Sequence, residues 1–234
     1  TMHWNTLAEQ LFDSPHRIEA DALLLRGSAD IDGRAVTVVG TTEHAPIGVA
    51  LALAQARVVL DTVKQHPGRP ILLLVDTQGQ QLRRRDELLG INRAMAHLGM
   101  AIDFARRQGH TVLGLVYDQA LSGGFITSGL IADGCYALPE AEIRVMRIPA
   151  MARVTKLPEA TLEALSVGNP VFAPGVDNYV AMGGVRALWR GDLKAALRQA
   201  LQDTPAEDTR ARDGQVRGGR RMAADVIQRV LDAD

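Results

Sequence analysis

Two glycine-bearing junctions are the places in this sequence where residue types and spacing suggest chemistry. The second junction along the chain follows an apolar run, Thr111 to Tyr117, and places Gly123 and Gly124 just before another apolar run, Phe125 to Leu130. This order predicts a strand covered on both faces, a loop and a buried helix. Glycines at a helix start let a substrate oxygen approach unpaired backbone N–H groups. The junction therefore suits an anion or an oxyanion.

The first junction, which comes earlier in the chain, has the same order of elements. The run Ile71 to Asp76 reads as a buried strand, ends in Thr77-Gln78-Gly79-Gln80, and precedes a helix expected over Glu87 to Gln108. Repeated strand–loop–helix units place both loops at the carboxyl edge of neighbouring parallel strands. We assign the N–H groups around Gly123 and Gly124 to one oxyanion hole and those around Gln78, Gly79 and Gln80 to a second. Tight packing of helix on strand is the competing explanation of the glycine pair.

Charged and titratable residues add few candidates. Arg83, with Arg84 and Arg85, follows the first glycine loop, where a cation meets a carboxylate or a phosphate, or simply faces solvent. The cluster Arg217, Arg220 and Arg221 reads as a solvated linker. The histidines, including His44 and His97, show no metal-ligand spacing with one another or with carboxylates, so no metal site is predicted. Cys135 reads as a small buried apolar residue.

Composition limits the class of protein. The chain has 234 residues, a formal net charge of −1 and one cysteine. The near-neutral charge gives no case for binding nucleic acid or an acidic membrane surface. A single cysteine excludes an internal disulfide framework and favours a cytoplasmic location. No apolar run reaches the length of a membrane span, and no signal peptide is recognised.

The expected organisation is one domain over residues 1–202, followed by a segment over 203–234 made of a linker and a terminal helix, Arg221 to Leu231. A helix over Val49 to Gln65 is apolar nearly all round in its first three turns. A helix of that kind is buried in a core or in a subunit interface, which predicts an obligate partner.

An ordered set of motifs resembles a known family. The set consists of VDTQG (Val75 to Gly79), the pair Gly123-Gly124, CYALPEAEIRVM (Cys135 to Met146), AMARVTKLPEATLEALS (Ala150 to Ser166) and NPVFAPGVDNYVAMGGVRALW (Asn169 to Trp189). It resembles the carboxyltransferases of the crotonase-like superfamily. Within them it is most similar to the gamma subunits of malonate decarboxylases.

The resemblance implies an α/β fold, a crotonase-like superhelix of repeated ββα units. It also implies a carbon–carbon lyase that turns a malonyl thioester into an acetyl thioester and carbon dioxide through an enolate. Implied partners are a beta subunit of the same fold, an acyl-carrier subunit with a phosphopantetheine-type arm, and an acyl-carrier transferase subunit. The chain itself is expected to bind no cofactor.

Three alternatives stay open at this point. Biotin-dependent relatives move the carboxyl group to biotin on a carrier instead of releasing carbon dioxide. Ser122 is a nucleophile in a hydrolase reading, because the superfamily includes the serine peptidase Clp, but no histidine follows on the next long helix. Ser122 is therefore read as a hydrogen-bond donor or a helix cap. In the third alternative the glycines only pack, and the partner carries all the chemistry.

Overall fold

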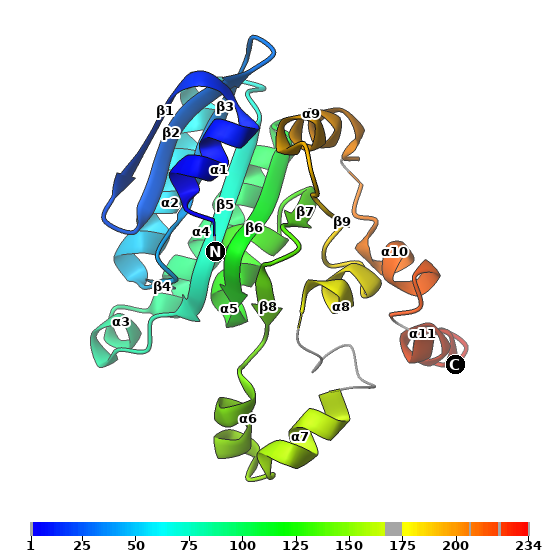
Figure 1. The fold of residues 1–234 in the computed structure, drawn as a ribbon. Coiled ribbons are helices and arrows are strands. Elements are labelled where there is room, and N and C mark those ends of the chain that lie inside the picture. The colour runs from blue at the N-terminus through cyan, green and yellow to red at the C-terminus, as the bar shows by residue number, and fades with distance from the viewer. Residues whose placement is uncertain (1, 167–174, 206, 220, 234) are drawn as a thin grey trace.

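The computed structural model describes residues 2–166, 175–205, 207–219 and 221–233. The described strands form one nine-stranded sheet in the order β1-β2-β3-β5-β6-β7-β9, with β4 paired to β5 and β8 paired to β6 (Figure 1). Three antiparallel strands begin the sheet: β1 (Asp13–Asp21), β2 (Leu24–Ile31) and β3 (Arg34–Thr41). The parallel strands are β4 (Ala45–Ile47), β5 (Ile71–Gln80), β6 (Val112–Leu121), β7 (Gly134–Ala137), β8 (Glu142–Arg144) and β9 (Ala187–Leu188).

Helices cover both faces of the central strands. One face packs against α1 (Trp4–Leu11) and α9 (Leu193–Asp203), and the other against α2 (Val49–Gln65) and α4 (Ile91–Arg107) (Figure 1). Side chains along β5 alternate between these two faces. Leu72 and Leu74 pack in the core under α1 and α9, whereas Ile71 and Leu73 pack in the core under α2 and α4. The prediction of strands buried on both faces is confirmed. The predicted bounds of the Val49–Gln65 helix are also confirmed, and its buried residues include Ala52, Ala56 and Val59.

The central strands extend further than their apolar runs. β5 continues through the segment expected to be a loop, because β4 pairs with it at Gly79 and Gln80. β6 continues to Leu121, where β8 pairs with it. The expectation that these segments are loops is wrong, because strand partners from other parts of the chain satisfy their backbone groups.

A break divides the helix expected over Glu87 to Gln108. The structure has α3 (Arg84–Leu88), then Gly90 in the left-handed region at φ 76°, then α4. Glycine adopts this conformation at little cost, so the chain turns there and α4 begins at Ile91. Leu88, the last residue of α3, is exposed.

The segment after β6 and β7 carries short helices. α5 (Ser122–Phe125) begins in the segment predicted as a loop and runs directly into a π-helical turn, η1 (Ile126–Leu130), which covers most of the helix predicted over Phe125 to Leu130. Further along lie α6 (Ile148–Thr155), α7 (Glu159–Ser166) and α8 (Val176–Ala181). Part of the quoted motif after Asn169 lies outside the described residues. Every described helix is too short or too polar to span a bilayer.

The expected linker contains a packed helix, α10 (Arg210–Val216), before the terminal helix α11 (Arg221–Leu231). Arg210 donates from its guanidinium to the carbonyl oxygen of Leu130. Arg217 donates to the carbonyl oxygens of Val180 and Val185 at 2.9 and 3.1 Å. The reading of Arg217 as part of a solvated linker is therefore wrong. Its side chain ties α10 to the turn that follows α8.

Candidate functional site

The two glycine junctions meet at the carboxyl edge of the sheet. β5 and β6 are parallel neighbours, paired from Ile71 with Val112 to Thr77 with Ala120. A Cβ atom added at Gly124 would lie 2.8 Å from the Cα atom of Gly79, closer than real Cβ atoms approach such atoms. The predicted neighbourhood of the two junctions is confirmed, and at this point the backbones are in direct contact.

The first junction presents one N–H group fewer than its sequence suggests. The N–H of Gly79 donates to Thr77 Oγ1 at 3.0 Å, and the same hydroxyl donates to the carbonyl oxygen of Ala45 at 2.6 Å. Gln81 donates its N–H to Ile47 of β4 at 2.9 Å. Successive N–H groups along a strand point to opposite sides, so the N–H of Gln80 is directed away from β4. Gln80 is thus the candidate oxyanion donor of this junction.

Gly79 has a different role from Gln80. Its φ of 102° lies in the region that favours glycine, and a Cβ there would lie 3.0 Å from Ser122 Cβ. Gly79 therefore lets β5 approach the start of α5. Gln78 beside it is exposed. The proposed roles of Gly79 and Gln78 stay predictions.

The paired glycines of the second junction differ from each other. The close contact with Gly79 requires that residue 124 has no Cβ atom. For Gly124, the competing explanation by tight packing therefore holds. A Cβ at Gly123 would lie 3.5 Å from Gln80 Oε1 and 4.0 Å from Met95 Cε, both ordinary contacts. Packing therefore does not require glycine at position 123. The N–H groups in the first turn of α5 have no partner within the helix, and a bare Cα at Gly123 leaves them open to a ligand.

Ser122 begins α5 in a left-handed conformation, with φ 55°. Its hydroxyl donates to the carbonyl oxygen of Val145 at 2.6 Å, and no histidine is hydrogen-bonded to it in the described part of the chain. A serine nucleophile needs a base that accepts its proton, and here a carbonyl occupies that position. This contact supports the reading of Ser122 as a positioning donor that joins α5 to the residue following β8.

A groove borders the first junction. It has a volume of about 360 Å³ and is lined by Pro46, Gly48, Leu51, Ala54 and Arg83, among others. Arg83 is exposed and donates to Gln81 Oε1 at 3.0 Å, one residue beyond Gln80. The Oε1 atom of Gln80 is itself buried and has no hydrogen-bond partner among the described residues. The charged residues that line the groove are Arg83, Asp21 and Asp86, and the rest of its lining is mostly apolar, which suits an extended, polar-ended ligand.

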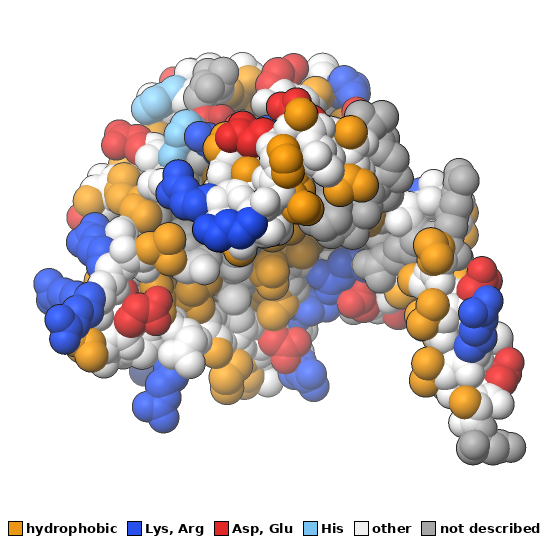
Figure 2. All heavy atoms as spheres, turned by 90° about the horizontal axis from the view of Figure 1, so that it is seen from below, with side chains coloured by type: hydrophobic (Ala, Val, Ile, Leu, Met, Phe, Trp, Pro, Cys, Tyr) orange, Lys and Arg blue, Asp and Glu red, His pale blue; other side chains and the backbone are white. Residues whose placement is uncertain are grey.

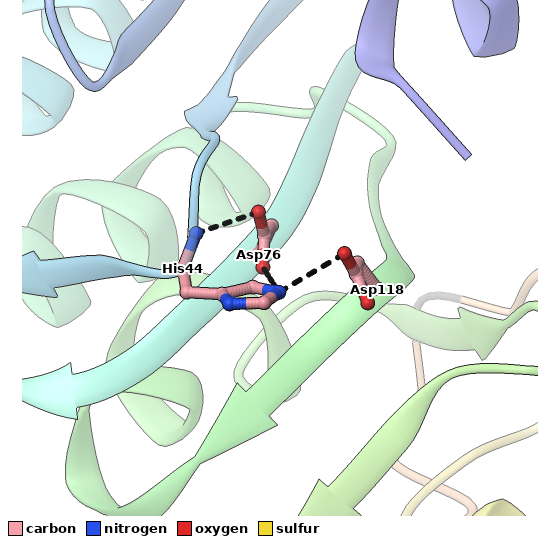
Figure 3. A group of neighbouring side chains, drawn as sticks. All are labelled: His44, Asp76 and Asp118. Atoms are coloured by element: carbon pink, nitrogen blue, oxygen red, sulfur yellow. Dashed lines mark hydrogen bonds and ion pairs between the residues drawn. The ribbon is translucent and has the colours of Figure 1, made fainter. Parts of the chain in front are cut away.

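Two groupings near this edge were not found in the sequence. One is the carbonyl of Val145, since a backbone acceptor carries no sequence signal. The other brings His44 to Asp76 and Asp118, 32 and 74 residues away along the chain (Figure 3). Spacing in the sequence suggested no carboxylate partner for His44, and the fold supplies two. Cys135 is buried as predicted, and burial raises the pKa of its thiol to about 12.

Comparison with known proteins identifies close relatives. Residues 42–234 match the family model described as the malonate decarboxylase gamma subunit. A malonyl-S-ACP:biotin-protein carboxyltransferase from Malonomonas rubra is 33% identical over 204 residues, an alignment that covers 79% of this chain and 69% of that protein.

Solved structures agree with these matches. A Pseudomonas malonate decarboxylase hetero-tetramer in complex with coenzyme A contains a chain that is 27% identical, with a TM-score of 0.75 and 95% of both chains covered. A transcarboxylase 12S structure has a TM-score of 0.73 at 21% identity, covering 87% of this chain and 41% of that one, and shows the fold alone. The predicted crotonase-like carboxyltransferase fold is confirmed.

The unequal surroundings of the two glycines predict unequal effects on stability. Gly124→Ala should lower the free energy of unfolding by roughly 1–3 kcal/mol, because β5 and α5 must separate to admit the methyl group. Gly123→Ala should change it by less than about 1 kcal/mol, because its Cβ meets only ordinary contacts. Urea denaturation of both variants measures the difference. Equal losses would show that both glycines serve packing.

Proposed function

Because the chain belongs to the malonate decarboxylase gamma-subunit family, we propose that its two junctions form one wall of the site where a malonyl thioester loses carbon dioxide. The observation that carries the proposal is the position of Gly123. Packing does not require glycine there, and a Cβ atom at this position would lie 3.5 Å from the Oε1 atom of Gln80, whose backbone N–H is the candidate donor of the first junction. Backbone donors of both junctions that lie near one another suit a developing oxyanion.

The chemistry explains why backbone donors suffice. Cleavage of the bond between the α-carbon and the carboxylate releases carbon dioxide and leaves the electron pair as an enolate, whose oxygen carries the negative charge. A proton added to the α-carbon then gives the acetyl thioester. One oxyanion donor is worth roughly 2.7 to 4 kcal/mol of transition-state stabilisation. The N–H groups of Gln80 and of the first turn of α5, at Gly123 and Gly124, are the donors that we assign to this task.

The substrate in this proposal arrives on the phosphopantetheine-type arm of an acyl-carrier subunit. The groove beside β4 supports this, because its apolar walls at Pro46, Leu51 and Ala54 suit an extended arm. The exposed Arg83 lines the groove, and its guanidinium would pair with the phosphate of the arm. Gln81, which follows the candidate donor Gln80, lines the same groove.

A beta-type partner completes the site in this proposal. Structures of Pseudomonas malonate decarboxylase contain hetero-dimers and hetero-tetramers. In this chain α11 projects from the body and carries hydrophobic side chains along its length (Figure 2). Those exposed to solvent are Met222, Val226, Ile227, Val230 and Leu231. Such a stripe at helical spacing is typical of a helix that binds another protein.

A second candidate function is transfer of the carboxyl group to biotin, which the name of the Malonomonas rubra relative favours. Both reactions begin with the same bond cleavage, so the junctions described above serve either. Avidin separates them, because it sequesters biotin. We expect decarboxylation by the complete enzyme to be unchanged by avidin. Complete inhibition would establish the biotin-dependent reaction instead.

The oxyanion role predicts a specific pattern of activity. In the assembled complex, Gly123→Ala should lower kcat roughly tenfold or more, because its methyl group enters the space of the substrate oxygen. Ser122→Ala should keep most of the activity, because its hydroxyl serves the carbonyl of Val145. Steady-state decarboxylation of the malonyl-carrier substrate measures both.

Two outcomes would contradict this account. Loss of activity in Ser122→Ala with full activity in Gly123→Ala would favour a serine nucleophile. Full activity in both variants would place the chemistry in the partner, with this chain as a scaffold. Size-exclusion chromatography of each complex confirms that assembly is retained.

The position of Arg83 predicts an effect on substrate binding. Arg83→Ala should raise KM for the malonyl-carrier substrate roughly two- to fivefold, the effect of one exposed ion pair, and leave kcat nearly unchanged. The neighbouring exposed Arg84, which does not line the groove, supplies the matched control Arg84→Ala. Equal effects of the two variants would show that general surface charge, not the groove, governs KM.

A further inference from the structure

Three side chains from three separate segments converge beside the carboxyl edge of the sheet (Figure 3). His44 lies in the turn before β4, Asp76 in β5 and Asp118 in β6. The Nε2 atom of His44 lies 3.1 Å from Asp118 Oδ2 and 3.7 Å from Asp76 Oδ1. Both carboxylates are therefore directed at the same ring nitrogen.

Irregular backbone brings these residues together. Val75 pairs with Val116 and Thr77 with Ala120, so three residues of β6 stand opposite Asp76 alone. A bulge of this kind redirects side chains, and here it includes Asp118. On the other side, His44 has a φ of 50°, and its N–H donates to Asp76 Oδ2 at 2.8 Å. The backbone of the turn is thus hydrogen-bonded to the carboxylate of Asp76, which the imidazole of His44 also faces.

The two carboxylates of the cluster carry more negative charge than the neighbouring side chains of this chain compensate. The side chain of Asp76 is 3% exposed and that of Asp118 15%. No lysine or arginine in the described ranges forms an ion pair with either carboxylate. A buried carboxylate is costly unless a positive charge compensates it, so the arrangement calls for a cation.

The donor atoms suit a metal ion. One donor from each of the three residues lies within 4.8 Å of the other two. With metal–ligand bonds of about 2.0–2.2 Å, neighbouring ligand atoms lie about 3 to 3.5 Å apart, and the two distances to His44 Nε2 are close to that range. Gln119 donates its N–H to Asp76 Oδ1 at 3.3 Å, a second contact that orients this ligand atom.

We propose that His44, Asp76 and Asp118 bind a divalent transition-metal ion of the Zn²⁺ type. One imidazole and two carboxylates form a neutral site with such an ion, and a nitrogen donor favours Zn²⁺ over Mg²⁺, which prefers oxygen ligands. The side chain of His44 is 48% exposed, so the ion is accessible from solvent and has positions open to water. The proposal does not rest on the proposed decarboxylation, because its test measures metal binding alone.

The bound ion has a structural consequence for the neighbouring junctions. Asp76 precedes Gly79 by three residues, and Asp118 precedes Ser122 by four. β4, which follows His44 directly, pairs with β5 at Gly79. An ion held by all three residues ties β4, β5 and β6 together immediately before both glycine junctions. It acts as a clamp that sets their positions.

Titration of the full chain with Zn²⁺ tests the proposal. The chain, purified without a metal-affinity tag and dialysed against EDTA and then buffer, is titrated with ZnCl₂ in a calorimeter, and in parallel with MgCl₂. Wild type should bind one equivalent of Zn²⁺, with much weaker binding of Mg²⁺. His44→Ala and Asp118→Asn should each weaken Zn²⁺ binding about tenfold or more. The exposed His97 on α4 gives the matched control His97→Ala, which should bind as wild type does.

Folding of each variant is checked by circular dichroism, and Asp118→Asn preserves the shape of a partly exposed side chain. The melting temperature gives an independent reading: Zn²⁺ should raise it for wild type and His97→Ala and leave it unchanged for His44→Ala. Binding of equal affinity in wild type, His44→Ala and Asp118→Asn would overturn the proposal. Absence of Zn²⁺ binding by folded wild type would overturn it as well.

Discussion

The contact between the backbones of Gly79 and Gly124 is the constraint on which the rest of the site depends. With 2.8 Å between the Gly79 Cα atom and the position of a Cβ at Gly124, β5 and α5 leave no room for a side chain between them. The contact brings the first turn of α5 next to the end of β5, and so places two sets of backbone N–H groups around one space. It also explains the unequal roles of neighbouring glycines. Gly124 closes the contact, whereas a side chain at Gly123 would meet only ordinary contacts with Gln80 and Met95.

Secondary pairings hold this contact in position. β4 and β8 extend the sheet beside the ends of β5 and β6, and their register keeps the polar segments after the apolar runs in strand conformation. Side chains add to these pairings. Ser122 binds the carbonyl of Val145, and Thr77 joins Gly79 to Ala45. These contacts join the ends of β5 and β6 to neighbouring segments of the same chain. The exposed hydrophobic stripe on α11 is the surface that we propose binds a partner.

Hydrophobic patterning was sufficient to predict α2 over Val49–Gln65 and the buried character of β5 and β6, because burial on both faces leaves runs without polar residues. The neighbourhood of the two junctions also followed from the repeated order of elements. The extension of β5 to Gln80 could not be predicted from the sequence. Polar and glycine residues in that segment are typical of loops, and its strand conformation depends on pairing with β4. The helix α10 was missed for a related reason: its sequence is polar, and contacts of Arg210 and Arg217 with distant carbonyls hold it. The cluster around His44 arises from a bulge in β6, which has no local signature.

The central claim concerns where the substrate oxygens lie, and a structure of the complex with its beta-type partner and a bound malonyl or acetyl thioester tests it most directly. We expect one oxygen of the thioester or of the carboxylate about 2.7–3.1 Å from the N–H of Gln80 or of the Gly123–Gly124 turn, the range of an oxyanion contact. A substrate whose oxygens all contact the partner, with no oxygen within hydrogen-bond distance of these groups, would contradict the account.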